Sequence, residues 1–147
     1  MGPNDAELVR VFTREVGGAI ADVTFPVADD FEVVVEVEAG SAIFGGGTQY
    51  ETGIVVRDKM AGDTIQATPQ LASGAGVPAN PAGFGPEGMA GAGTEWLSQA
   101  NQFVYKVEAA ALGGRENHIC EVMAFLKVRV TDPDVSFAIS PHFIITA

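Results

Sequence analysis

The feature that most constrains this chain is an alternation of apolar and polar residues in several short stretches. In 31–39, FEVVVEVEA, one side carries only apolar residues: Phe31, Val33, Val35 and Val37. A period of two places alternate residues on opposite faces of a β-strand, so one face enters a core and the other meets water. The stretch therefore predicts a half-buried strand of an antiparallel sheet.

The same period recurs in five further stretches: 19–27, 50–57, 103–111, 120–130 and 135–146. The last two are separated by TDPD, 131–134, where Pro133 suits a type I turn, so together they predict a long β-hairpin. Pro141 indicates a bulge or an edge position in the return strand. We place one apolar row on a single face of that strand: Phe137, Ile139, Phe143 and Ile145.

The first residues carry a different pattern. Asn4 and Glu7 have the spacing of a helical capping box, and Gly17-Gly18 would end a helix. We predict a short N-terminal helix, while β-branched residues such as Val9 and Val11 leave a strand open as the alternative.

The six strands do not alternate regularly with long helices, so the predicted fold class is mainly β. We expect an antiparallel β-sandwich or flattened barrel with a short N-terminal helix and a long Gly/Ala/Pro-rich loop. The alternative is an α+β fold in which the helix packs on one curved antiparallel sheet.

The chain of 147 residues, 47% of them hydrophobic, can bury one core, and we expect a single domain over 1–147. Residues 70–101 are expected to form a long loop insertion, because small residues and prolines cannot build a core of their own. Within it, GFGPEG, 83–88, has the glycine spacing of a dinucleotide site. We interpret this match as accidental, because no strand is predicted before it and no helix after it.

Charge and composition exclude several classes of partner. Eight Lys and Arg against nineteen Asp and Glu give a net charge of -11, which repels nucleic acids and anionic membranes. No apolar run approaches the roughly 18 residues of a membrane span, and no secretory signal pattern is visible. Cys120 is the only cysteine and allows no internal disulfide. We therefore expect a cytoplasmic protein that binds neither nucleic acid nor membrane.

His118, Cys120 and His142 are the only imidazoles and the only thiol. In the predicted hairpin His142 lies on the order of 16 Å from the row of His118, too far for a shared metal ion. We interpret Cys120 as an inert core residue and His118 as a solvated residue at a strand end. The sequence thus offers no catalytic, cofactor-binding or metal-binding residues, and it favours a protein that is not an enzyme.

Apolar residues also occur on the outward face of the hairpin. Met123 and Phe125 alternate with the core-facing row of 120–130, and Ile144 continues this outward pattern in the return strand. Apolar residues on both faces predict that this part of the sheet is covered on both sides.

The long loop would add three apolar anchors to such a surface: Phe84, Met89 and Trp96. The first hypothesis is a non-enzymatic protein-interaction or assembly module, which contacts a protein partner or itself through the apolar sheet face and the Gly-rich arm. The alternative is a small-molecule-binding or acid-base enzyme pocket covered by the Gly-rich loop, with Tyr50 or Tyr105 as a polar contact.

Overall fold

The computed structural model describes residues 6–39, 50–70, 88–93, 100–128 and 134–147. Its elements are β1 (Ala6–Glu15), β2 (Thr24–Pro26), β3 (Phe31–Ala39), β4 (Tyr50–Asp58), β5 (Asp63–Ile65), β6 (Thr68–Gln70), β7 (Gly88–Gly93), β8 (Ala100–Val107), the 3-10 turn η1 (Ala109–Ala111), β9 (Ile119–Val128), β10 (Asp134–Ile139) and β11 (Phe143–Thr146). The predicted mainly β class is confirmed, and no α-helix occurs within these ranges.

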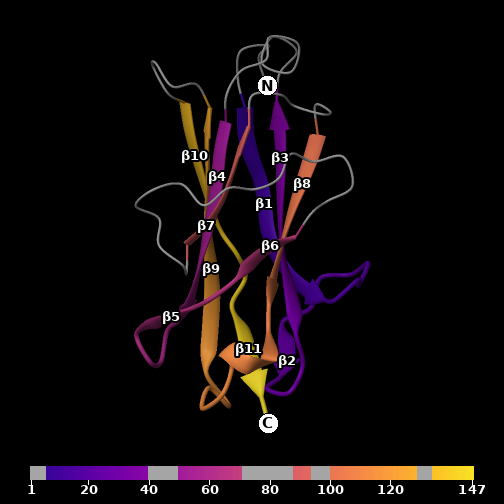
Figure 1. Cartoon of the computed structure of the whole chain (residues 1–147), viewed down its shortest axis with the longest axis vertical. Helices are drawn as coiled ribbons and strands as arrows, with labels where there is room; N and C mark the ends of the chain where they lie inside the picture. The colour runs from indigo at the N-terminus through magenta and orange to yellow at the C-terminus, as the bar shows by residue number, and fades with distance from the viewer. Residues whose placement is uncertain (1–5, 40–49, 71–87, 94–99, 129–133) are drawn as a thin grey trace.

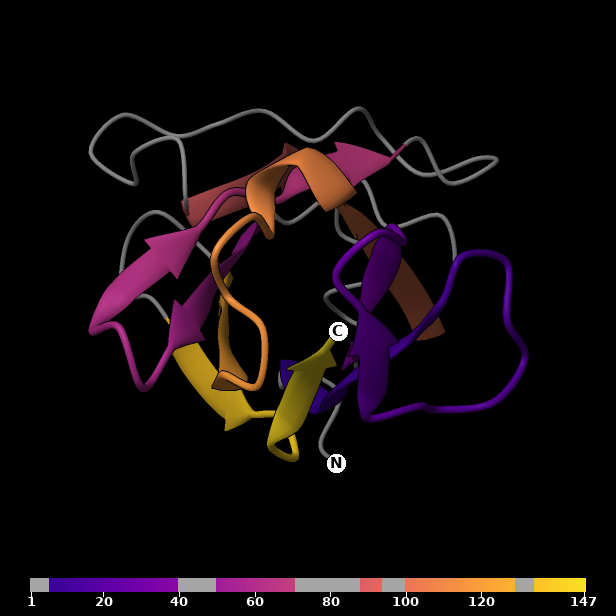
Figure 2. The same cartoon turned by 90° about the horizontal axis from the view of Figure 1, so that it is seen from below.

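Two sheets face each other. The smaller has the strand order β1-β3-β8-β6, and the larger has the order β2-β11-β9-β4-β5, with β10 paired to β9 and β7 paired to β4. All of these ladders are antiparallel except the one between β2 and β11. The long strands run along the long axis of the molecule (Figure 1), and a view along them shows strands arranged around a central core (Figure 2). The fold is a β-sandwich.

The core lies between the two sheets and consists of alternate residues of the central strands. Phe31, Val33 and Val35 of β3 are fully buried, as the period of two predicts. Three aromatic rings from β2, β3 and β11 pack together: Phe25 stacks on Phe31 at 4.5 Å between centroids, and Phe143 meets Phe31 edge-on at 5.2 Å. The labels of β2 and β11 lie at the lower end of Figure 1. Each buried side chain of this size contributes about 1.5–3 kcal/mol to folding.

The predicted N-terminal helix is wrong for residues 6–15, which form β1 along the edge of β3. The ladder with β3 gives this β-branched segment hydrogen bonds that suit its restricted side chains. A bulge between Leu8 and Arg10 shifts the register, so Leu8 and Val11 are both buried although they are three residues apart. Leu8 and Val11 therefore have the i, i+3 spacing of a helix although both lie in a strand.

Part of the segment 70–101, expected as loop, is also paired. Residues 88–93 form β7 along β4, with Met89 opposite Ile54, and β8 begins at Ala100. Glycine and alanine can form a strand here because β4 supplies the ladder of backbone hydrogen bonds. Phe84 and Trp96 lie outside the described residues, as do the rest of 71–87 and 94–99.

The predicted hairpin forms, but its return strand changes register. β10 pairs with β9 up to Ile139 opposite Met123, and β11 then resumes with Phe143 opposite Cys120, a shift of one residue. Ser140 marks the shift: its N–H donates to the Val122 carbonyl, and its Oγ accepts from the Val122 N–H. A shift of one residue moves side chains to the other face of a sheet.

The prediction that four apolar residues of the return strand share one face is therefore wrong. Phe143 and Ile145 are buried in the core, whereas Phe137 and Ile139 are 69% and 60% exposed. Pro141 lies between the two registers, in agreement with the predicted bulge, and the shift there puts the residues before it and after it on opposite faces.

Candidate functional site

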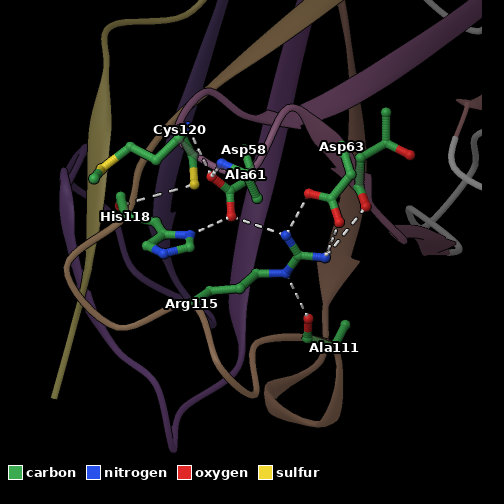
Figure 3. Close-up of polar contacts among 9 residues, drawn as sticks. Asp58, Ala61, Asp63, Ala111, Arg115, His118 and Cys120 are labelled. Carbon is green, nitrogen blue, oxygen red and sulfur yellow. Dashed lines mark hydrogen bonds and ion pairs between the residues drawn. The ribbon is translucent and has the colours of Figure 1, made fainter.

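A buried carboxylate at the end of β4 organises a cluster of polar contacts (Figure 3). The Asp58 side chain, at the end of β4, is fully buried. Its Oδ1 accepts the backbone N–H groups of Met60 and Ala61 at 3.0 and 2.9 Å. Its Oδ2 accepts Arg115 Nη1 at 2.8 Å and His118 Nδ1 at 2.6 Å. Four donors thus surround one carboxylate group.

Arg115 extends this cluster to the first residue of β5. Its guanidinium donates to both Asp63 oxygens, at 2.6 and 3.1 Å, and its Nε donates to the Ala111 carbonyl at 3.2 Å. The Arg115 guanidinium lowers the pKa of Asp63, and Asp63 together with Asp58 raises the pKa of Arg115. The cluster ties the β4–β5 turn to the segment that leads into β9.

Burial alone would raise the pKa of Asp58. Hydrogen bonds from the Ala61 N–H, His118, Arg115 and the Met60 N–H outweigh burial and lower the pKa to about 2. A carboxylate that already accepts four hydrogen bonds is stabilised in its charged form and has no lone pair left for a substrate. We name Asp58, Asp63, Arg115 and His118 the polar lock, because this geometry fixes two chain segments together.

Cys120 lies behind the lock, with its Sγ 3.9 Å from the His118 carbonyl oxygen. Burial, followed by the charge of Asp58, raises the pKa of the thiol to about 12, so it stays protonated at neutral pH. The buried position agrees with the prediction of an inert core residue. The prediction of a solvated His118 is wrong, since its side chain is 24% exposed and contacts Asp58.

Sequence reasoning missed the lock, although one signal was present. Asp58 follows Ile54 and Val56 at the same inward parity of β4, which is an unusual position for a carboxylate. A buried acidic residue requires nearby donors, but Arg115 and His118 are more than 50 residues away in the chain and only the fold brings them together.

A second feature lies on the outer face of the larger sheet, away from the core. On β10, Val135, Phe137 and Ile139 are 44%, 69% and 60% exposed. Phe137 is directly opposite Phe125 on β9, and Ile139 is opposite Met123. We call these five residues the outer apolar face.

Three of the six residues predicted from sequence as interface residues can be placed on this side of the sheet. Met123 and Phe125 are half-buried neighbours on β9, and both belong to the outer apolar face. Ile144 is half-buried on β11 and lies opposite Ile119, at the other end of β9. Phe137 and Ile139, the most exposed members of the face, were missed because of the register shift.

Charged groups border the outer apolar face. Glu121 accepts Lys59 Nζ at 3.3 Å and lies 3.2 Å from His142 Nε2. Arg57 of β4 is opposite Glu121 in register, and Lys127 of β9 is opposite Val135. Among the described residues, Arg57 and Lys127 take part in no ion pair.

The two histidines therefore serve different sites: His118 joins the buried Asp58, and His142 joins Glu121 on the outer side. Within the described ranges, no three His, Cys, Asp or Glu side chains are grouped so as to hold a metal ion. Those ranges also contain no helix with the length and apolar character needed to span a bilayer.

A shallow depression of about 240 Å³ lies beside η1, lined by Gln66, Thr68, Glu108, Ala110 and Ala111. It is smaller than the roughly 300–1,000 Å³ of most ligand sites. Tyr105, one of the polar contacts expected for a pocket, is fully buried in the core instead.

No protein-family model matches the chain, and no curated protein matches it. Among solved structures, the chain is similar to AggA, the major subunit of aggregative adherence fimbriae type I from Escherichia coli, at 8% identity and a TM-score of 0.48, over 94% of this chain and 97% of that one. It is also similar to the periplasmic chaperone SfaE, at 10% identity and a TM-score of 0.40, over 93% of this chain and 58% of that one. A third similarity is to a family 123 glycoside hydrolase from Clostridium perfringens, at 7% identity and a TM-score of 0.43, over 93% of this chain and 27% of that one. Likenesses this distant leave the function to be argued from the site itself.

Proposed function

We propose that this protein is a non-enzymatic assembly module that associates with further copies of itself through the outer apolar face. One observation carries the proposal: Val135, Phe137 and Ile139 form a continuous exposed apolar row on β10. Contiguous exposed apolar surface of this kind is typical of protein interaction sites, because water contact with it is unfavourable.

The neighbouring strand extends this row into a surface. Phe125 and Met123 stand beside Phe137 and Ile139 across the β9–β10 ladder, so two adjacent strands present apolar side chains on the same side. Aromatic residues and methionine are enriched in protein interfaces, and a rigid sheet presents them with little loss of conformational entropy. A second copy that covers this face would remove the Phe137 ring from water.

Light scattering coupled to gel filtration tests the proposal over a series of protein concentrations. The native chain should associate as its concentration rises, and Phe137→Ser and Ile139→Ser should each weaken that association by about tenfold or more. Both variants should keep the native melting temperature when dilute, because the side chains are exposed in the single copy.

Ile20→Ser is the matched control, since Ile20 is 81% exposed but lies in the segment between β1 and β2. It should associate like the native chain. A native chain that stays monomeric at the highest concentration would refute self-assembly, and an Ile20→Ser effect equal to that of Ile139→Ser would refute the outer apolar face as its site. The cytoplasmic location expected from the sequence stays a prediction, which fractionation of the source cells would check.

A further inference from the structure

Four strands lie side by side at the outer apolar face, in the order β10, β9, β4 and β7. Residues directly opposite each other in an antiparallel ladder have their side chains on the same side of the sheet. Val55 of β4 is in register with Met123, and Gly53 is in register with Phe125. Val55 is half-buried. The outer apolar face therefore continues from β9 onto β4.

The two halves of this four-stranded surface differ in bulk. On β10 and β9 stand the five large side chains of the outer apolar face. At the central rows, β4 has Gly53 and Val55, and β7 has Ala90 and Gly88 at the positions opposite them. A half with large side chains thus lies beside a half with small residues, and the border between the halves runs between β9 and β4.

Charged residues occupy the ends of the two middle strands in opposite order. On β9, Lys127 is at one end and Glu121 is at the other. On β4, Glu51 is in register with Lys127, and Arg57 is in register with Glu121. Each of these two rows therefore holds one acidic and one basic residue. A second copy with β9 and β4 exchanged brings opposite charges together, which is the electrostatic complementarity of specific interfaces.

The difference in bulk selects how a second copy can lie on this surface. Sheets that pack face to face usually keep their strands aligned within about 30°. The two-fold axis then lies along the strands or across them, and both choices bring opposite charges together. An axis across the strands places large side chains on large side chains and leaves voids between the small halves, which close packing disfavours. An axis along the strands, between β9 and β4, places Met123 on Val55 and Phe125 on Gly53 of the other copy.

We infer that two copies form a closed two-fold dimer, outer apolar face on outer apolar face, with the axis along the strands between β9 and β4. This inference rests on the proposed self-association and specifies its geometry. The same surface serves both copies, so the contact between Met123 and Val55 occurs twice. Because the dimer covers this surface in each copy, association stops at two chains.

A mixing experiment tests this geometry, with native mass spectrometry to separate the three possible dimers by mass. Val55→Phe adds bulk where Met123 of the other copy docks, and Met123→Ala removes bulk there. Each variant alone should dimerise at least about tenfold more weakly than the native chain. Their mixture should form the mixed dimer in large excess over both homodimers. One of its two contacts joins the enlarged side chain to the shortened one, and the other contact is native.

Mixing excludes an explanation from contacts within one copy, because each chain carries only one change. The matched control is Val55→Phe mixed with Phe137→Ser, which should stay weak because both chains keep Met123. Dilute Val55→Phe and Met123→Ala should each melt cooperatively. If Val55→Phe does not fold, the smaller enlargement Val55→Leu takes its place in the same experiment.

The outcomes separate this inference from the proposed function. If the native chain associates and the mixture of Val55→Phe with Met123→Ala gives no excess of mixed dimer, self-assembly stands and the axis between β9 and β4 is overturned. Native assemblies larger than two chains would overturn the closed dimer in the same way. If the native chain is monomeric at every concentration, the proposed function itself fails.

Discussion

The outer faces of the two sheets differ in how far they expose apolar side chains to water. On the smaller sheet, Phe12 and Val34 are neighbours that are 9% and 0% exposed, and the Arg10 guanidinium lies 4.2 Å above the Phe12 ring. Arg10 also pairs with Glu36 at 2.8 Å. On the larger sheet, the Phe137 side chain also lies on the outer face of its strand, but it is 69% exposed. The same chain covers the outward Phe12 with a charged side chain and leaves the outward Phe137 open.

This difference indicates that the outer face of the smaller sheet is suited to contact with water. Two ion pairs cross β1 and β3, Arg10–Glu36 and Arg14–Glu32, and Gln102 adds a hydrogen bond to Glu36 from β8. Long charged side chains cover apolar surface with their methylene groups and keep their charges in water. No such cover lies over Val135, Phe137 and Ile139 among the described residues, so a partner surface is the cover we propose for them.

The largest expected loss of stability comes from removing a buried charge. Asp58→Asn removes the buried charge that Arg115 and His118 contact, and we expect a loss of about 3–5 kcal/mol in the free energy of unfolding. Urea denaturation of the purified variant measures it. A loss as small as that of an exposed ion pair would mean that the polar lock does not stabilise the sandwich, and the contrast between buried and surface charges would disappear.

Acid should reproduce this loss in the native chain. The folded-state pKa of Asp58 is about 2, below the ordinary value of 3.8. A lowered folded-state pKa contributes stability that is complete above pH 3.8 and is lost as the pH falls toward 2. Melting temperatures across this range should fall more steeply for the native chain than for Asp58→Asn. Parallel curves for the two proteins would contradict the assignment.

Matched truncations of two outward phenylalanines test the comparison directly. Phe12→Ala should cost about 3 kcal/mol, because its ring is covered by Arg10 and packed beside Val34. Phe137→Ala should change the stability of the dilute single copy by less than about 0.5 kcal/mol, because most of its ring is already in water. Equal losses for the two variants would show that Phe137 packs within one copy and would remove the basis for an interface.

Much of this architecture could be predicted from the sequence, and the failures have local causes. The alternation in 31–39 and 120–130 predicted β3 and β9, and the apolar outward residues Met123 and Phe125 lie where the pattern placed them. Two regions contradicted the predicted pattern, and each contains a single-residue shift in register: residues 6–15 form β1, with a bulge at Val9, where a helix was predicted, and the shift at Ser140 reversed the face of Phe137. A period of two carries no information on which strand absorbs an extra residue.

The polar lock could not be predicted from the sequence, and the reason is a different one. Its members Asp58, at the end of β4, and Arg115, before β9, are far apart in the chain, and sheet pairing brings them together. The polar group around Glu121 has the same origin, since Arg57 and His142 lie near Glu121 only through the pairing of β4 and β11 with β9. Pairing partners, more than side-chain types, were the missing information.

The smallest expected effect comes from Glu36→Gln on the smaller sheet. The variant breaks the ion pair with Arg10, whose guanidinium can still lie over Phe12, so the apolar cover remains. Exposed ion pairs add little to stability because water and salt screen them. The melting temperature should therefore shift much less than for Phe12→Ala, and the small difference from the native chain should vanish in high salt. A shift as large as that of Phe12→Ala would mean that the charged layer holds the smaller sheet together. The outer apolar face of the larger sheet would then differ from the outer face of the smaller sheet in its contribution to stability as well as in its exposure.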